Sequence, residues 1–168
     1  MLVLVVDVAN VMGSRPDGWW RDRAGAASRL MASLVPLVAA DVVVPTIGVL
    51  PADVSPSSPV SAGAPKSADA PDSMGSAGAP KSADSADTAV RIDRIVAVIE
   101  GQARTATAPP ELEVVLAPAD GDTSIVEVAE QVLADGDVPL VVTADRGLRA
   151  RLPFGSRIAG PGWLLGLL

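Results

Sequence analysis

The sequence predicts an α/β domain with a parallel β-sheet that helices cover on both faces. Two observations predict it. Apolar runs such as LVLVV at 2–6 and RIVAVIE at 94–100 are nearly continuous, as in strands buried on both faces, and they are separated by segments with helical spacing. The length of 168 residues suits one domain. We therefore expect a single α/β domain.

The first half of the chain predicts two strands, one helix and a β-prone segment. Residues 2–6 read as a strand. Residues 23–37 read as a helix whose apolar side chains recur on one face. Residues 42–50 are β-prone and predict an edge strand or one arm of a hairpin. Residues 94–100 predict the next strand of the sheet.

The second half continues the alternation of strand and helix. Residues 113–116 (EVVL) predict a short strand, and residues 123–134 a helix with Asp122 at its start, where an acid suits the free N–H groups. The remaining predicted elements are a strand at 139–143 (PLVVT), a short helix at 145–151, a last short strand at 157–159 and the closing segment GPGWLLGLL.

Residues 51–89 differ in kind from the rest. They are rich in Pro, Ser, Ala, Gly and Asp, and the nonamer SAGAPKSAD occurs at 61–69 and again at 76–84. Such a segment has too few large apolar groups to bury a core. We interpret it as a disordered insertion in a surface loop, which a folded domain tolerates because loop-closure cost grows slowly with length.

Composition excludes several kinds of chemistry. The chain has no cysteine and no histidine, so disulfides, thiolates, Ser-His-Asp triads and histidine–metal sites are excluded. Any catalysis must rely on carboxylates, most simply with Mg²⁺ or Mn²⁺, which prefer oxygen ligands. No apolar run reaches the roughly 18 residues needed to span a bilayer, and no secretory signal pattern is present. We therefore expect a soluble, cytoplasmic protein.

The charge distribution bears on the partner. The net charge is −7, which argues against nucleic acid. However, both lysines of the chain lie within residues 51–89, and every base outside that segment is an arginine. Arginine recognises phosphate with a planar, two-pronged geometry, although a high-GC genome produces the same preference for arginine.

Carboxylates follow four of the predicted strands. Asp7 ends the first strand, Glu100 ends the strand at 94–100, Asp120 and Asp122 follow 113–116, and Asp145 follows 139–143. The carboxyl ends of parallel strands line the crevice where α/β folds bind ligands. Acids gathered there repel one another unless a cation neutralises them. The pattern therefore indicates a metal site suited to phosphodiester hydrolysis.

Each of these acids also has a purely structural interpretation. Asp7 can begin a turn, Asp122 and Asp145 can cap helices, Asp120 can belong to a turn, and Glu100 can face solvent. Only the coincidence across four strands favours a common site.

Four segments together resemble a known family. They are VVDVANVMGSRPDGWWRDRAG, the acid after the strand at 94–100, GDTSIVEVAEQ and VVTADRGLRARL. They resemble the NYN branch of the PIN-like ribonuclease superfamily, in particular small actinobacterial NYN-domain proteins. The resemblance covers most of residues 1–37 and 90–168 and none of 51–89.

The resemblance implies a three-layer α/β/α fold with parallel strand order 3-2-1-4-5, an acidic crevice that binds Mg²⁺ or Mn²⁺, and RNA as substrate. It implies that Asp7, Asp122 and Asp145 are catalytic metal ligands, that Glu100 is a further ligand, and that Asn10 holds the Asp7 loop or touches substrate. Two positions depart from the family pattern. Val8 stands where relatives have Gly, and Thr123 stands where a second acid is common.

Arginines follow the same strands as the acids and suggest a basic rim that holds phosphates. The rim would contain Arg15, Arg21, Arg23, Arg104, Arg146, Arg149 and Arg151. Trp20, in the same region as Arg21, could stack on an unpaired base, while Trp19 or Trp20 could instead pack over the sheet edge. Trp163 is expected in the core.

Three functions compete at this stage. The first is a metal-dependent endoribonuclease. The second is a PIN-like module without catalysis that binds RNA or a protein, which the two departures and the negative charge favour. The third is pyrophosphohydrolysis, suggested by the pair Glu127 and Glu130, but the second motif of those all-α enzymes is missing. The sequence leaves open whether the chain forms a homodimer or meets an antitoxin-like protein partner.

Overall fold

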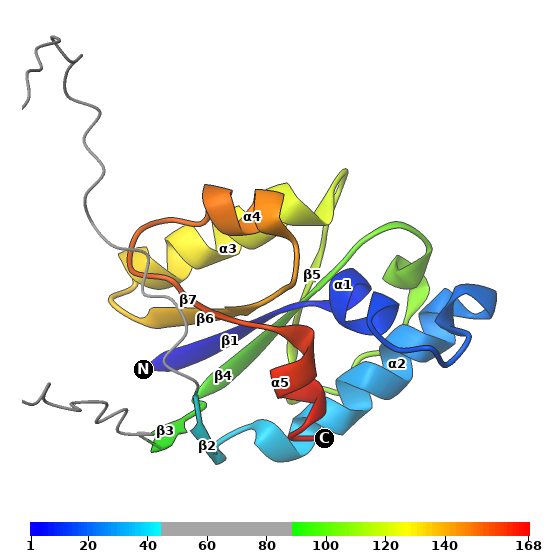
Figure 1. Ribbon diagram of the computed structural model, residues 1–168, viewed down its shortest axis with the longest axis horizontal. Coiled ribbons are helices and arrows are strands. Elements are labelled where there is room, and N and C mark those ends of the chain that lie inside the picture. Colours follow the sequence, from blue (N-terminus) through cyan, green and yellow to red (C-terminus); the bar gives the residue numbers. More distant parts are fainter. Residues whose placement is uncertain (45–88) are drawn as a thin grey trace, which may run out of the picture.

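A five-stranded parallel sheet forms the centre of the molecule. The computed structural model describes residues 1–44 and 89–168. The strands of the sheet are β1 (Leu2–Asp7), β4 (Arg94–Ile99), β5 (Glu113–Leu116), β6 (Val138–Val142) and β7 (Arg157–Ala159). Their spatial order is β5-β4-β1-β6-β7, and every pairing is parallel (Figure 1). The predicted α/β class with a parallel sheet is therefore confirmed.

Side chains of the central strands alternate between two hydrophobic cores. Leu2, Leu4 and Val6 of β1 belong to one core, and Val3 and Val5 to the other. All five are at most 4% exposed. Because helices cover both faces, the run LVLVV can be apolar without interruption and still obey the two-residue period of a strand.

The first core lies under α1 (Val8–Gly13), α2 (Arg23–Leu34) and α5 (Pro161–Leu165). Figure 1 shows these helices on one side of the sheet. The helix predicted at 23–37 ends at Leu34, and a 3₁₀ turn, η2, follows at Val35–Leu37. Pro36 explains the change, because proline has no N–H to donate to the carbonyl four residues earlier in an α-helix.

Helix α1 was not predicted from the sequence. It begins directly after Asp7, and its Val8, Val11 and Met12 side chains are buried. Two of these residues are β-branched and have modest helix propensity, so packing against the sheet, rather than local preference, accounts for the helix.

The second core lies under α3 (Gly121–Ala134) and α4 (Arg146–Arg151), on the opposite side of the sheet (Figure 1). Ile125, Ala129 and Val132 of α3 are buried against it. Helix α3 begins two residues before the predicted start. The expectation that Asp122 caps it is wrong: Asp120 is the N-cap, because its Oδ1 accepts a 2.7 Å hydrogen bond from the Thr123 N–H.

A separate two-stranded antiparallel ribbon joins β2 (Asp41–Val43) and β3 (Ala89–Arg91). Val43 pairs with Ala89, so the residues on either side of segment 45–88 lie next to each other. The β-prone segment predicted at 42–50 is a strand only as far as Val43 among the described residues. Val44 is buried but follows the strand, and residues 45–50 lie outside the residues that the structure describes, as do residues 51–88 of the predicted insertion. Ala89, the last residue of that predicted insertion, begins β3 instead.

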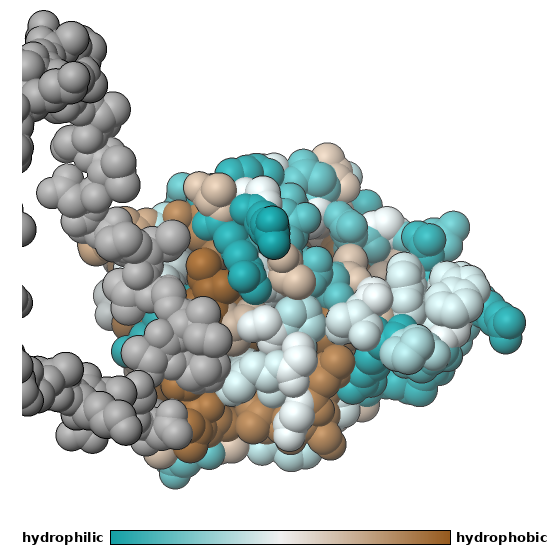
Figure 2. All heavy atoms as spheres, in the orientation of Figure 1, coloured by the Kyte–Doolittle hydropathy of each residue, from teal (hydrophilic) through white to brown (hydrophobic). Residues whose placement is uncertain are grey.

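The connections and the surface complete the fold. Two more 3₁₀ turns, η1 (Trp19–Arg21) and η3 (Gly101–Thr105), precede α2 and follow β4. In the described ranges no helix is long and apolar enough to cross a membrane. Hydrophilic residues cover much of the α3 and α4 side, whereas apolar residues reach the surface near β2 and the C-terminal end (Figure 2).

Candidate functional site

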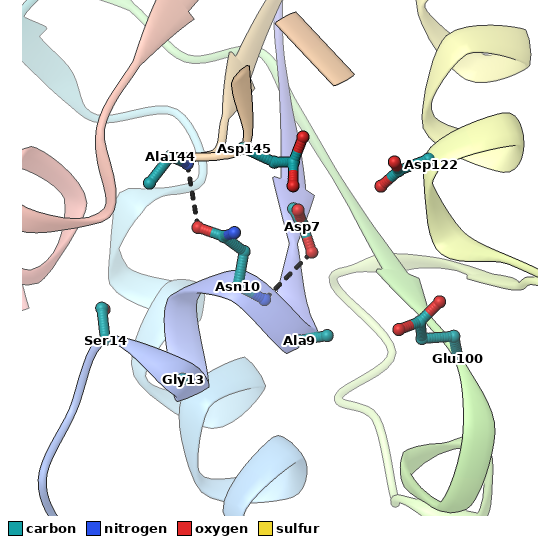
Figure 3. Close-up of a pocket in the computed structure, with 9 residues that line it drawn as sticks. All are labelled: Asp7, Ala9, Asn10, Gly13, Ser14, Glu100, Asp122, Ala144 and Asp145. Carbon is teal, nitrogen blue, oxygen red and sulfur yellow. Dashed lines mark hydrogen bonds between the residues drawn. The ribbon is translucent and has the colours of Figure 1, made fainter. Parts of the chain in front are cut away.

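A pocket of about 530 Å³ opens at the carboxyl ends of the parallel strands. Four carboxylates from four separate segments reach it, as expected from the ends of neighbouring parallel strands. Figure 3 shows them facing a common space from β1, the end of β4, α3 and the end of β6. The lining residues are Asp7, Ala9, Asn10, Gly13, Ser14, Glu100, Asp122, Ala144 and Asp145.

Asp7 is the buried acid of the pocket, with 8% of its surface exposed. Its Oδ1 accepts a 3.0 Å hydrogen bond from the Asn10 N–H and thereby caps α1. Its Oδ2 accepts a 2.9 Å hydrogen bond from the Thr143 hydroxyl. Burial raises the pKa of Asp7 above its usual value, and the negative charges of Asp122 and Glu100 add to the rise, while the two hydrogen bonds oppose it.

Asn10 ties the start of α1 to the loop that follows β6. Its Oδ1 accepts a 2.8 Å hydrogen bond from the Ala144 N–H (Figure 3). The three-residue spacing from Asp7 to Asn10 thus has two structural consequences. The backbone of Asn10 holds the Asp7 carboxylate, and its side chain holds the loop that carries Asp145.

Asp145 lies at the N-terminus of α4 and caps it, since its Oδ1 accepts a 2.8 Å hydrogen bond from the Leu148 N–H. The Asp145 N–H donates to the Thr143 hydroxyl at 3.1 Å. Asp145 therefore caps α4, as its structural interpretation predicts, and also lines the pocket. A carboxylate has about four lone-pair sites, so capping leaves it able to accept further contacts.

Glu100 turns toward the start of α3. Its Oε2 accepts a 2.5 Å hydrogen bond from the Gly121 N–H, where a free helix N-terminus favours a negative charge. A Cβ on Gly121 would lie only 2.9 Å from that oxygen. Gly121 therefore permits the approach. Sequence reasoning missed this residue, although a glycine between two acids at a helix start is a signal that could have been used.

Asp122 occupies the first turn of α3 beside the cap residue Asp120. Partial burial raises the pKa of Asp122, and the nearby carboxylates of Asp145, Asp120 and Glu100 raise it further. Arg151 opposes this effect: its Nη1 lies 3.8 Å from Asp122 Oδ2, and its Nη2 donates to the Thr123 hydroxyl at 3.0 Å. A guanidinium thus already neutralises one edge of the acidic pocket.

The arginines of the predicted basic rim do not line the pocket as the acids do. No arginine side chain lines the pocket in the part of the chain that the structure describes. Arg149 is half-buried, and its Nε and Nη2 donate to the Thr143 carbonyl at 3.1 and 2.5 Å, so it supports the loop. The side chains of Arg15, Arg21, Arg104 and Arg146 have no hydrogen bond or ion pair within the described residues.

The tryptophans take three different positions. Trp19 is half-buried and packs against the first core, while Trp20 is 55% exposed. Arg23 lies over the Trp19 ring, 5.4 Å from its centroid. Trp163 is only partly buried, and its indole N–H donates a 3.0 Å hydrogen bond to the Val43 carbonyl of β2.

The four acids line the same pocket, but their carboxylates do not surround a single position for a metal ion. Within residues 1–44 and 89–168, no group of three or more acidic side chains is arranged to hold a metal ion. The donor set is nevertheless made of carboxylate and amide oxygens, which suit hard divalent cations.

Comparison with models of known protein families, with curated proteins and with solved structures finds no match to this chain.

Proposed function

We propose that this chain is a metal-dependent ribonuclease with a PIN-like fold, which hydrolyses RNA phosphodiester bonds at the acidic pocket. The observation that carries the proposal is the convergence of Asp7, Glu100, Asp122 and Asp145 on one pocket from four separate segments. Burial raises the pKa values of Asp7 and Asp122, and repulsion from neighbouring carboxylates of the pocket adds to the rise. A fold tolerates such repulsion most readily where a cation relieves it.

The topology supports the PIN-like part of the proposal. When only the five strands of the larger sheet are counted in chain order, β5-β4-β1-β6-β7 reads 3-2-1-4-5. This is the order that the resemblance implies. The sheet also carries helices on both faces, as a three-layer fold requires.

The cation would be Mg²⁺ or Mn²⁺, held by Asp7 with Asp145, Asp122 or Glu100. When bound, it would polarise a phosphate oxygen and activate water. The pocket fits such an ion by its donor atoms but not by the present positions of its side chains. Binding therefore requires that Asp122 or Glu100 turn further toward Asp7.

The chain's own residues keep the two central acids in place. Thr143 and Asn10 orient Asp7, and the same two residues hold the loop that carries Asp145. Both acids are therefore fixed before any ligand enters, which is what a preorganised site needs.

A second candidate, a PIN-like module that binds RNA or a protein without cleaving it, is favoured by a specific observation. Arg151 contacts both Asp122 and Thr123, the position where a second acid is common among the proteins that this chain resembles. A guanidinium there supplies positive charge beside Asp122, at one edge of the pocket. Under this second proposal Arg151 takes over part of the charge neutralisation that a metal ion would otherwise provide.

Cleavage of a mixed pool of structured and single-stranded RNA distinguishes the two candidates. Wild type, Asp7→Asn and Asp145→Asn are compared with Mn²⁺, Mg²⁺ or EDTA. Glu127→Gln is the matched control, because Glu127 is an exposed acid of α3 outside the pocket. We expect metal-dependent cleavage by wild type and Glu127→Gln and none by the two pocket variants. Failure of wild type to cut, or equal cutting by the pocket variants, would overturn the ribonuclease proposal.

A further inference from the structure

The segment between α1 and α2 places aromatic and basic side chains beside the acidic pocket. Gly13, the last residue of α1, lines the pocket. A Cβ built on Gly13 would lie 3.9 Å from Cζ2 of Trp19, which is ordinary contact distance. The Trp19 ring therefore lies next to a residue of the pocket wall, and Trp20 lies next to Trp19.

The two tryptophans differ in what they leave free. Trp19 packs against the first core and lies beneath the Arg23 guanidinium. Trp20 meets it edge to face, with ring centroids 6.3 Å apart and an interplanar angle of 84°. This geometry is a favourable one for aromatic pairs. Trp19 thus anchors Trp20, which is 55% exposed and available to a ligand.

The charged residues of this segment favour an anionic ligand. The two acids of the segment form hydrogen bonds or an ion pair with other groups of the protein. Asp17 Oδ1 accepts from the Trp19 N–H at 3.1 Å, and Asp22 accepts from the Gly25 N–H at 2.8 Å and lies 3.7 Å from Arg29. Arg21 and Arg23 are exposed, so their guanidinium groups can meet phosphates.

We infer that Trp20, Arg21 and Arg23 form a binding surface for an unpaired segment of RNA that leads into the acidic pocket. This inference rests on the proposed function, because it names the form of RNA which that pocket would receive. Trp20 stacks on one base, and the arginines contact the flanking phosphates. Such contacts tolerate any base, because every base has a face on which an indole can stack.

A surface of this kind binds single-stranded RNA in preference to a duplex. In a duplex the faces of the bases are covered by their neighbours, so an indole reaches them only at ends, loops and bulges. The acidic pocket itself repels phosphate in the absence of a cation. Affinity without metal must therefore come from the surface outside the pocket.

The test is binding of a fluorescently labelled oligonucleotide, followed by anisotropy in EDTA, where metal-dependent cleavage cannot occur. A single-stranded RNA is compared with the same strand in a blunt duplex. The variants are Trp20→Ala and Trp20→Phe, and the control is Phe154→Ala. Phe154 is 61% exposed and lies between α4 and β7, just before β7 begins, whereas the pocket lies where strands end.

We expect wild type to prefer the single strand and Trp20→Ala to bind it about 5- to 150-fold more weakly, the range for losing one stacked base. Trp20→Phe should restore part of the affinity, because a smaller ring still stacks, and Phe154→Ala should match wild type. The inference is overturned if wild type does not bind the single strand, if it binds the duplex equally well, or if Trp20→Ala and Phe154→Ala have equal affinity.

The two proposals fail in different ways. Loss of the Trp20 effect with cleavage intact would remove the binding surface and leave the ribonuclease. A Trp20-dependent single-strand affinity without cleavage would support the binding surface and remove metal-dependent hydrolysis.

Discussion

The hydroxyl group of Thr143 donates a 2.9 Å hydrogen bond to Oδ2 of Asp7, although the two residues are 136 positions apart in the chain. The same hydroxyl accepts a 3.1 Å hydrogen bond from the Asp145 N–H. Thr143 is fully buried. One buried hydroxyl therefore fixes both central acids of the pocket relative to each other.

Replacing Thr143 with valine should destabilise the fold by about 1–3 kcal/mol, the cost of leaving buried polar groups without partners. Valine keeps the shape of threonine but can neither donate to Asp7 nor accept from the Asp145 N–H. Thr143→Ser, which keeps the hydroxyl, should lose less free energy of unfolding. Urea unfolding of the three proteins measures the difference. Equal free energies of unfolding for the valine variant and wild type would contradict this role of the hydroxyl.

Arg149→Lys should destabilise the fold although it preserves the charge. The Arg149 guanidinium directs two N–H groups at the Thr143 carbonyl, which an ammonium group on a flexible stem does not reproduce. We expect a loss of about 1 kcal/mol in unfolding free energy. Arg146→Lys, at an exposed position in the same helix, should change it by less than about 0.5 kcal/mol. If lysine is tolerated equally at both positions, Arg149 does not support the loop.

Gly121→Ala should separate stability from activity. Alanine suits a helix interior better than glycine by up to about 1 kcal/mol, but Gly121 is the first residue of α3, where this gain is smaller. The new Cβ would lie 2.9 Å from Glu100 Oε2, and the flexible Glu100 side chain would have to move. The displaced Glu100 loses the hydrogen bond that it accepts from the Gly121 N–H, which offsets the gain in helix propensity. We expect a melting temperature close to that of wild type together with slower RNA cleavage. Unchanged cleavage would show that the position of Glu100 is unimportant.

The pKa of Asp7 predicts a pH dependence of stability. Because the folded-state pKa is raised, the folded protein binds the Asp7 proton more tightly than the unfolded chain does. The ionised carboxylate therefore disfavours folding at neutral pH, and this penalty disappears as the pH falls through the raised pKa toward the ordinary value of about 3.9.

Compared with Asp7→Asn, which cannot titrate at this position, wild type should gain relative stability as the pH falls from about 7 to about 4. Urea unfolding of both proteins across this range measures the trend. A constant difference between them, or a gain for Asp7→Asn on acidification, would contradict the raised pKa.

The sequence predicts the sheet well because its strands are buried on both faces. Runs such as residues 2–6 and 95–99 have no polar interruption, and their type is clear from composition alone. Helix α1 could not be predicted in the same way. Its valines favour strands locally, and only the core beneath it holds them in a helix.

The strand topology predicts where the acids of the pocket lie, but it does not predict the hydrogen bonds that their side chains make. Parallel strands deliver Asp7, Glu100 and Asp145 to one edge, so the sequence suffices to place them there. Which aspartate caps α3 depends on where the helix begins. The helix begins two residues before its predicted start, so Asp120 rather than Asp122 is the N-cap. The contact of Arg149 with Thr143 depends on side-chain geometry that no spacing rule contains.

The most direct test of the account is titration of the metal-free protein with Mn²⁺, with free ion followed by electron paramagnetic resonance. We expect saturable binding by wild type and by Glu127→Gln, and none by Asp7→Asn or Asp145→Asn in the same range. Saturable binding that survives both pocket substitutions, or no saturable binding by wild type, would contradict the claim that the four converging carboxylates form a cation site.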